Sequence, residues 1–167
     1  MKVLVAAASD HGSTAEIASA IGEALKERVL AVTVAPVEKV QSVDGDDAFV
    51  IGSAVYAGHW LKRARDFVQH HARVLSMRPV WLFSSGPIGN PPTPKEEAVD
   101  VVPLAAAVQA RSHRVFGGKL DRSTLGFAER AIATALRAPE GDFRDFAEIR
   151  GWGLGIAEWL HQQEVAL

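Results

Sequence analysis

Three short segments of small and polar residues carry the chemistry that this sequence offers. The first, Ser9-Asp10-His11-Gly12-Ser13-Thr14, follows an apolar run and opens a helical pattern. Backbone N–H groups at a helix N-terminus point toward an anion, and Ser and Thr hydroxyls add donors. The segment lacks Lys and Arg and matches neither a Walker loop nor a G-x-G-x-x-G loop. It suits one terminal phosphate; alternatively, Ser9 turns the chain and Ser13 or Thr14 caps the helix.

The other two segments each follow a buried apolar run. They are Ser53-Ala54-Val55-Tyr56-Ala57-Gly58-His59-Trp60 and Ser85-Gly86-Pro87-Ile88-Gly89-Asn90. Their glycines allow the backbone to approach a ligand closely, and Tyr56 and Trp60 offer aromatic faces. A flavin needs such faces together with backbone N–H groups at its polar end. The three segments together suit FMN; the alternative for Trp60 is that it starts a helix and packs on the surface.

Apolar runs alternate with helical patterns along the chain, and they must position these segments. We expect strands at 2–7, 29–35, 48–53, 80–84 and 113–117, and helices at 14–28, 60–75, 95–110 and 146–162. Strands that are apolar throughout are typical of a parallel sheet covered on both faces. Right-handed crossovers then favour a doubly wound α/β sheet with strand order 2-1-3-4-5. Ligands of such sheets bind outside the carboxyl ends of the strands.

The stretch 120–145 does not fit this alternation. We expect it to be an insertion after the fifth strand, within a single domain that spans 1–167. Apolar residues recur at helical spacing in its segment 125–136, namely Leu125, Phe127, Ala128, Ile132 and Leu136. We expect this stripe to cover the flavin edge or to dock a membrane or a partner; the alternative is simple packing on its own domain.

Composition narrows the function classes. The 167 residues include no cysteine and carry a formal net charge of -2 at pH 7. The missing cysteines exclude disulfides, iron–sulfur clusters and thiol catalysis, and the spacing of the histidines gives no metal site. A net charge near zero gives no electrostatic support for a nucleic-acid partner. The apolar start is too short for an exported signal or a membrane span, so we expect a cytoplasmic protein.

The order strand, S-x-H-G-S-T, helix, followed by I-G-S-A-V-Y-A-G-H-W, resembles the flavodoxins. More narrowly, it is similar to the bacterial flavodoxin-like protoporphyrinogen oxidases, also called menaquinone-dependent protoporphyrinogen IX dehydrogenases. Three features point to that branch: Gly58-His59-Trp60, Phe83-Ser84, and Val115-Phe116-Gly117-Gly118-Lys119-Leu120-Asp121. Flavodoxin itself binds FMN at the switch point of its sheet, so the location of the site is taken from the resemblance.

The resemblance implies an FMN-dependent oxidoreductase with a small-molecule donor and a quinone acceptor. It places phosphate contacts on Ser9, His11, Gly12, Ser13 and Thr14, and ring contacts on 53–59 and 85–90. His59 is the one candidate acid or base in the ring loops. The third segment lacks the basic residues expected for porphyrinogen propionates, so cations would come from Lys62, Arg63, Lys95 or Arg122.

Two other functions fit the same pattern. A flavodoxin-type electron carrier binds redox partner proteins and has no substrate pocket. Such carriers are usually strongly acidic, so a net charge of -2 argues against this function. A cofactor-free regulatory or scaffold domain would keep the fold alone. The intact first segment argues against that third function.

Overall fold

The structure is a computed structural model that describes residues 1–29, 31–86 and 98–166. Along the chain its strands and helices are β1 (Lys2–Ala8), α1 (Ser13–Leu25), β2 (Ala31–Pro36), η1 (Val37–Lys39), β3 (Ala48–Tyr56), β4 (His59–Trp60), α2 (Lys62–Leu75), β5 (Val80–Ser85), α3 (Val101–Val108), β6 (Ser112–Phe116), β7 (Lys119–Leu120), η2 (Arg122–Thr124), α4 (Phe127–Ala135), β8 (Gly141–Asp142) and α5 (Phe146–Val165).

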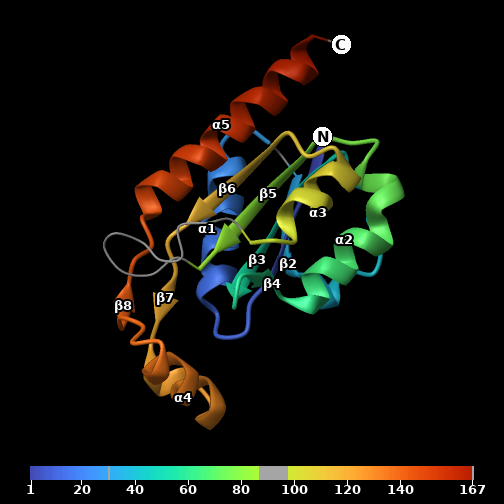
Figure 1. Ribbon diagram of the computed structural model, residues 1–167. Coiled ribbons are helices and arrows are strands. Elements are labelled where there is room, and N and C mark those ends of the chain that lie inside the picture. The colour runs from blue at the N-terminus through green and yellow to red at the C-terminus, as the bar shows by residue number, and fades with distance from the viewer. Residues whose placement is uncertain (30, 87–97, 167) are drawn as a thin grey trace.

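The main sheet has the order β2-β1-β3-β5-β6, and all neighbours in this path run parallel. In chain order of these five strands this is 2-1-3-4-5, so the predicted doubly wound α/β fold is confirmed. Helices α1 and α5 cover one face of the sheet, and α2 and α3 cover the other (Figure 1). The described residues include no helix that is both long and apolar enough to cross a bilayer.

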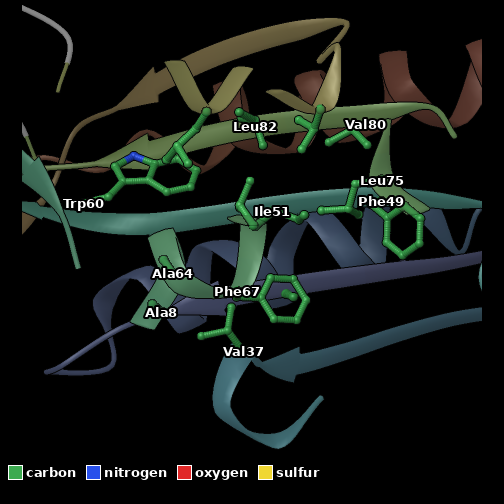
Figure 2. Close-up of a cluster of buried hydrophobic side chains, with 14 of the residues drawn as sticks. Ala8, Val37, Phe49, Ile51, Trp60, Ala64, Phe67, Leu75, Val80 and Leu82 are labelled. Carbon is green, nitrogen blue, oxygen red and sulfur yellow. The ribbon is translucent and has the colours of Figure 1, made fainter. Parts of the chain in front are cut away.

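Side chains of β1 explain why its sequence is apolar throughout. Val3 and Val5 pack with α1 and α5, whereas Leu4 and Ala6 belong to the cluster on the opposite face. Successive strand residues point to opposite faces, and both faces of this sheet are buried. Figure 2 shows the second cluster, where Phe67 of α2 packs toward the strands.

The second loop is a β-hairpin, which the sequence did not predict. β3 continues to Tyr56, the chain turns at Ala57 and Gly58, and β4 pairs antiparallel with β3. Both turn residues have positive φ, 49° and 77°. The helix expected from residue 60 therefore begins at Lys62. Trp60 lies in β4 rather than on a helix.

Several other expected bounds also differ from those of the structure. The helix expected over 95–110 begins at Val101 within the described residues and ends at Val108. Pro103 lies in the first turn of α3, where a missing N–H breaks no helical hydrogen bond, so the helix is not split there. β5 extends to Ser85, β6 ends at Phe116, and α5 continues to Val165.

The expected insertion forms a separate lobe after β6. β7 and β8 pair as an antiparallel ribbon, and η2 and α4 lie between them. In Figure 1 this lobe lies beyond the carboxyl ends of β5 and β6. Ala133 is the buried residue of α4, whereas Phe127, Ile132 and Leu136 are 93%, 60% and 75% exposed. The alternative of simple burial of the whole stripe is therefore wrong.

Candidate functional site

A cavity of about 460 Å³ lies at the carboxyl ends of β1, β3 and β5. Parallel strands bring the ends of three sequence segments together at this edge. Eleven residues of those segments line the cavity: Ser9, Asp10, His11, Ser13, Thr14, Ala54, Val55, Tyr56, Ala57, Ser85 and Gly86. The cavity lining does not include Gly12, Ser53, Gly58, His59 or Trp60, and Pro87, Ile88, Gly89 and Asn90 lie outside the described residues.

The first loop delivers the N-terminus of α1 to this cavity. Gly12 precedes the helix with φ 84°, a conformation that favours glycine. No side chain of the described residues caps α1, so the expected alternative of a Ser13 or Thr14 cap is wrong. Thr14 is the second helical residue, is only 2% exposed and lines the cavity. Uncapped amides and buried hydroxyls of this kind fit an anionic group.

Tyr56 and Ala57 bring the tip of the β3–β4 hairpin to the cavity. Burial raises the pKa of the Tyr56 phenol to about 12, and the charges of Asp10 and Glu129 add to the shift. The phenol is therefore neutral at ordinary pH and remains a hydrogen-bond donor.

At the end of the neighbouring strand β5, the Cα of Gly86 faces Val55, and a Cβ added at Gly86 would lie 3.0 Å from the Val55 Cβ. A side chain at this position would therefore crowd Val55, and Gly86 itself offers only backbone to the cavity that it lines.

Trp60 anchors the β3–β4 hairpin to the core, and its ring does not line the cavity. Its side chain is 1% exposed, and its indole N–H donates to the Ser84 Oγ at 2.8 Å. The Ser84 hydroxyl also hydrogen-bonds to the His113 Nε2 at 2.7 Å. The expectation of surface packing for Trp60 is wrong, because a non-local pairing between β3 and β4 places it in the core beside β5. The expected flavin contact stays a prediction, and Trp60 does not line the cavity.

His59 and Trp60 are both tied to Asp100, just before α3. The Asp100 carboxylate accepts the backbone N–H of Trp60 at 2.8 Å, and the His59 Nδ1 lies 3.1 Å from its other oxygen. The His59 side chain is about half exposed and does not line the cavity. The structure therefore places His59 in a supporting contact. It does not bring His59 to the other candidate residues.

The far wall of the cavity comes from the insertion, and it includes Leu125, Ile132 and Leu136 of the predicted apolar stripe. The residues of this wall are Gly118, Lys119, Asp121, Thr124, Leu125, Glu129, Ile132, Ala133, Leu136, Arg137, Ala138 and Pro139. The His11 Nε2 lies 2.8 Å from the Glu129 Oε2, which links the first loop to α4. The apolar stripe over 125–136 was the sequence feature that indicated a covering role for this segment.

Arg144 anchors the base of the insertion to α1. Its guanidinium donates to the Ser13 carbonyl oxygen at 3.1 Å, to Glu16 at 2.9 Å and to Asp142 at 2.8 Å. These hydrogen bonds lower the pKa of the Asp142 carboxyl to about 2. The neighbouring Asp145 accepts two backbone N–H groups of α5, as expected for a helix N-cap. The lobe therefore has a charged attachment beside the first loop.

The cationic side chains that were expected to bind propionates do not line the cavity where the structure describes them. Lys62 pairs with Asp66 at 2.5 Å, and Arg63 pairs with Asp10 at 2.8 Å. Arg122 bonds within the insertion, to Thr134 and Ala138, and Lys95 lies outside the described residues. Lys119 and Arg137 line the cavity instead. Their placement depends on the lobe, which is why loop sequence alone did not identify them.

The donor set matches a flavin phosphate better than a metal or a nucleotide triphosphate. Within 1–29, 31–86 and 98–166, no group of three or more His, Cys, Asp or Glu side chains is arranged to hold a metal ion. The first loop offers helix amides and hydroxyls, and the other walls are apolar side chains and exposed backbone. Such a cavity can hold one phosphate at its first loop and a flat ring between the hairpin and α4.

Comparison with known proteins agrees with this geometry. Protoporphyrinogen IX dehydrogenase [quinone] of Escherichia coli K12 is 31% identical over 94 residues, 55% of this chain and 52% of that protein. The chain thus matches about half the length of that relative. The same match is found in Escherichia coli O157:H7.

Solved structures with little sequence identity share the fold. An archaeal flavodoxin superposes with a TM-score of 0.64 at 17% identity, covering 95% of this chain and 97% of its own. Flavodoxin 1 of Bacillus cereus gives 0.62 at 16% identity, covering 92% and 95%. The flavodoxin domain family model matches residues 4–146. The chain therefore belongs to the flavodoxin domain family, and its cofactor is FMN.

Proposed function

We propose that this protein is an FMN-dependent oxidoreductase that oxidises a small organic donor and reduces a quinone, in the manner of a protoporphyrinogen dehydrogenase. The observation that carries the proposal is the wall that α4 and the residues flanking it add to the cavity. Leu125, Ile132 and Leu136 close the space beside the loops with apolar side chains. An electron carrier needs an exposed flavin edge, whereas a substrate needs an enclosed apolar space next to the ring.

The proposed roles follow from the positions of the residues. The α1 N-terminus with Ser9, Ser13 and Thr14 holds the phosphate, and the Tyr56–Ala57 turn with Gly86 holds the ring. Bound FMN supplies reversible two-electron chemistry between donor and quinone. The apolar side chains of α4 exclude water from the ring and pack against the donor.

Lys119 and Arg137 support a donor that carries carboxylates. Both line the cavity and come from the insertion. Ammonium and guanidinium groups bind carboxylates through charge-assisted hydrogen bonds. The propionates of a porphyrinogen would meet these two cations. The cations come from the insertion rather than from the third loop, so the lack of basic residues in that loop does not oppose the proposal.

Anaerobic half-reactions of the FMN-loaded protein test the proposal. Protoporphyrinogen mixed with the oxidised protein should bleach the visible flavin absorbance, and a menaquinone analogue should restore it after reduction. Normal reoxidation by quinone without bleaching by protoporphyrinogen would refute a porphyrinogen donor. Failure of both half-reactions would favour an electron carrier with a protein partner.

Matched variants separate the donor contact from general effects of charge. Lys119→Gln with Arg137→Gln should slow bleaching by protoporphyrinogen and leave quinone reoxidation unchanged. Lys62→Gln removes a cation that pairs with Asp66 and does not line the cavity, so it serves as the control. Equal bleaching rates in all three proteins would show that the two cations do not contact the donor.

A further inference from the structure

A second cavity of about 540 Å³ lies between β6 and α5, and it shares no lining residue with the flavin site. β6 is the last strand of the main sheet, so this face lies at the open edge of the molecule. We call it the α5 groove. Its lining consists of Trp81, Arg114, Glu148, Gly151, Trp152, Gly155, Ile156 and Trp159.

Gly151 and Gly155 form the hollow of the α5 groove. Both are exposed, and a Cβ added at either residue would meet nothing within 4 Å. Glycine is unfavourable in a helix interior relative to alanine. Gly153, between them, is needed for packing, because its Cβ would lie 2.8 Å from the Ala24 Cβ of α1. Packing within this chain gives no such reason for the two exposed glycines.

A bulky side chain on the same helix face, Trp159, borders this hollow; its ring is partly buried and lies edge-on to Trp81, with 5.4 Å between the ring centroids. Trp159 follows Gly155 by four residues, and Gly151 precedes it by four, so all three lie on one face of α5. A two-fold axis through Gly155 of two antiparallel α5 helices would place Trp159 of each copy against Gly151 of the other. Identical surfaces related by a two-fold axis must be self-complementary in this way.

Charged side chains at the two ends of the α5 groove also favour this antiparallel pairing of two α5 helices. The Arg111 guanidinium lies 3.9 Å from the centre of the Trp159 ring, so it accompanies the bulky end. Glu148 precedes Gly151 by three residues and lines the hollow end, where its carboxylate lies 3.4 Å from the Arg114 Nε of its own chain. The antiparallel arrangement brings Arg111 of one copy to Glu148 of the other, twice per pair. A parallel arrangement would instead bring like ends together.

We propose that the α5 groove is the interface of a two-fold homodimer, in which Trp159 of each copy fills the glycine hollow of the other. α5 has 20 residues, which at 1.5 Å per residue is about 30 Å, long enough for an interface of ordinary size. The proposal does not depend on the redox function, because the groove and the flavin cavity have no lining residue in common.

Sedimentation equilibrium of the FMN-loaded wild-type protein is the first test, and it should give twice the 17.9 kDa chain mass. Gly155→Leu fills the hollow and should give the monomer. Its thermal midpoint should not fall, since the added side chain enters open space and favours the helix. His161→Leu, on an exposed part of α5 outside the groove lining, is the control and should remain dimeric.

A charge exchange tests the predicted partners of the two ends. Arg111→Glu and Glu148→Arg should each weaken the dimer, because each variant alone pairs like charges. Mixing the two variants restores both opposite-charge pairs in a heterodimer, so the mixture should dimerise. A monomeric wild type overturns the proposal and leaves the groove to another protein or a small aromatic ligand. Dimers that persist unchanged in Gly155→Leu overturn it as well.

Discussion

Thr14→Ala should weaken FMN binding while leaving riboflavin binding nearly unchanged. The Thr14 side chain is 2% exposed and, at the second residue of α1, lines the cavity at the carboxyl ends of β1, β3 and β5. Its hydroxyl can therefore donate to a phosphate oxygen in a place where bulk water does not replace it. A hydrogen bond to a charged group contributes about 1–3 kcal/mol, which is roughly a fivefold to 150-fold loss of affinity.

The methyl group of Thr14 must be separated from its hydroxyl. Removing a buried methyl costs about 1 kcal/mol of stability whether or not a phosphate is bound. Thr14→Ser keeps the hydroxyl and loses the methyl, so it should bind FMN nearly as well as the wild type. Thr14→Val keeps the shape and loses the hydroxyl, so it should bind FMN as weakly as Thr14→Ala.

Quenching of flavin fluorescence, titrated with FMN and with riboflavin, gives both dissociation constants for each variant. Urea unfolding of each protein without flavin provides the accompanying stability. Riboflavin has no phosphate, so only its ring and ribityl contacts are measured. If Thr14→Ala weakened both flavins by the same factor, the first loop would not hold the phosphate.

Three further outcomes follow from the structure. Deletion of residues 125–137 should keep FMN binding and abolish turnover with a small donor, since few side chains of α4 are buried in the rest of the domain. Loss of the folded state in circular dichroism would instead show that the segment is structural. Gly52→Ala should lower the free energy of unfolding in urea by about 1–3 kcal/mol, because the added Cβ would lie 2.2 Å from the buried Phe83 ring. An unchanged urea midpoint would show that the Phe83 ring moves freely. Tyr56, the single tyrosine, should ionise near pH 12 in the folded protein rather than near 10. The stability that this raised pKa contributes is complete below about pH 10 and is lost as the pH rises toward 12. The side chain is 41% exposed, so a phenolate absorbance titration with a midpoint near 10 would show that partial desolvation at the cavity does not shift its pKa.

The sequence alone was sufficient to predict the sheet and the loops that meet at its edge. A strand such as Lys2–Ala8 is apolar on both faces, and only a sheet covered by helices on both sides buries it. Strand order then brings the residues after β1, β3 and β5 to one edge. Thr14 and Tyr56 could be assigned to a common site for this reason, although they are far apart in the chain.

Tertiary structure decided how those loops are shaped and what closes the site. Trp60 reads as a helix start, because its neighbours are compatible with a helix and its antiparallel partner Val55 lies across a turn. Its hydrogen bond to Ser84 depends on β5, which is distant in sequence. Likewise the apolar stripe of α4 was visible in the sequence. Its position over the cavity depends on long-range contacts of His11 with Glu129 and of Arg144 with Ser13, and no local periodicity encodes such contacts.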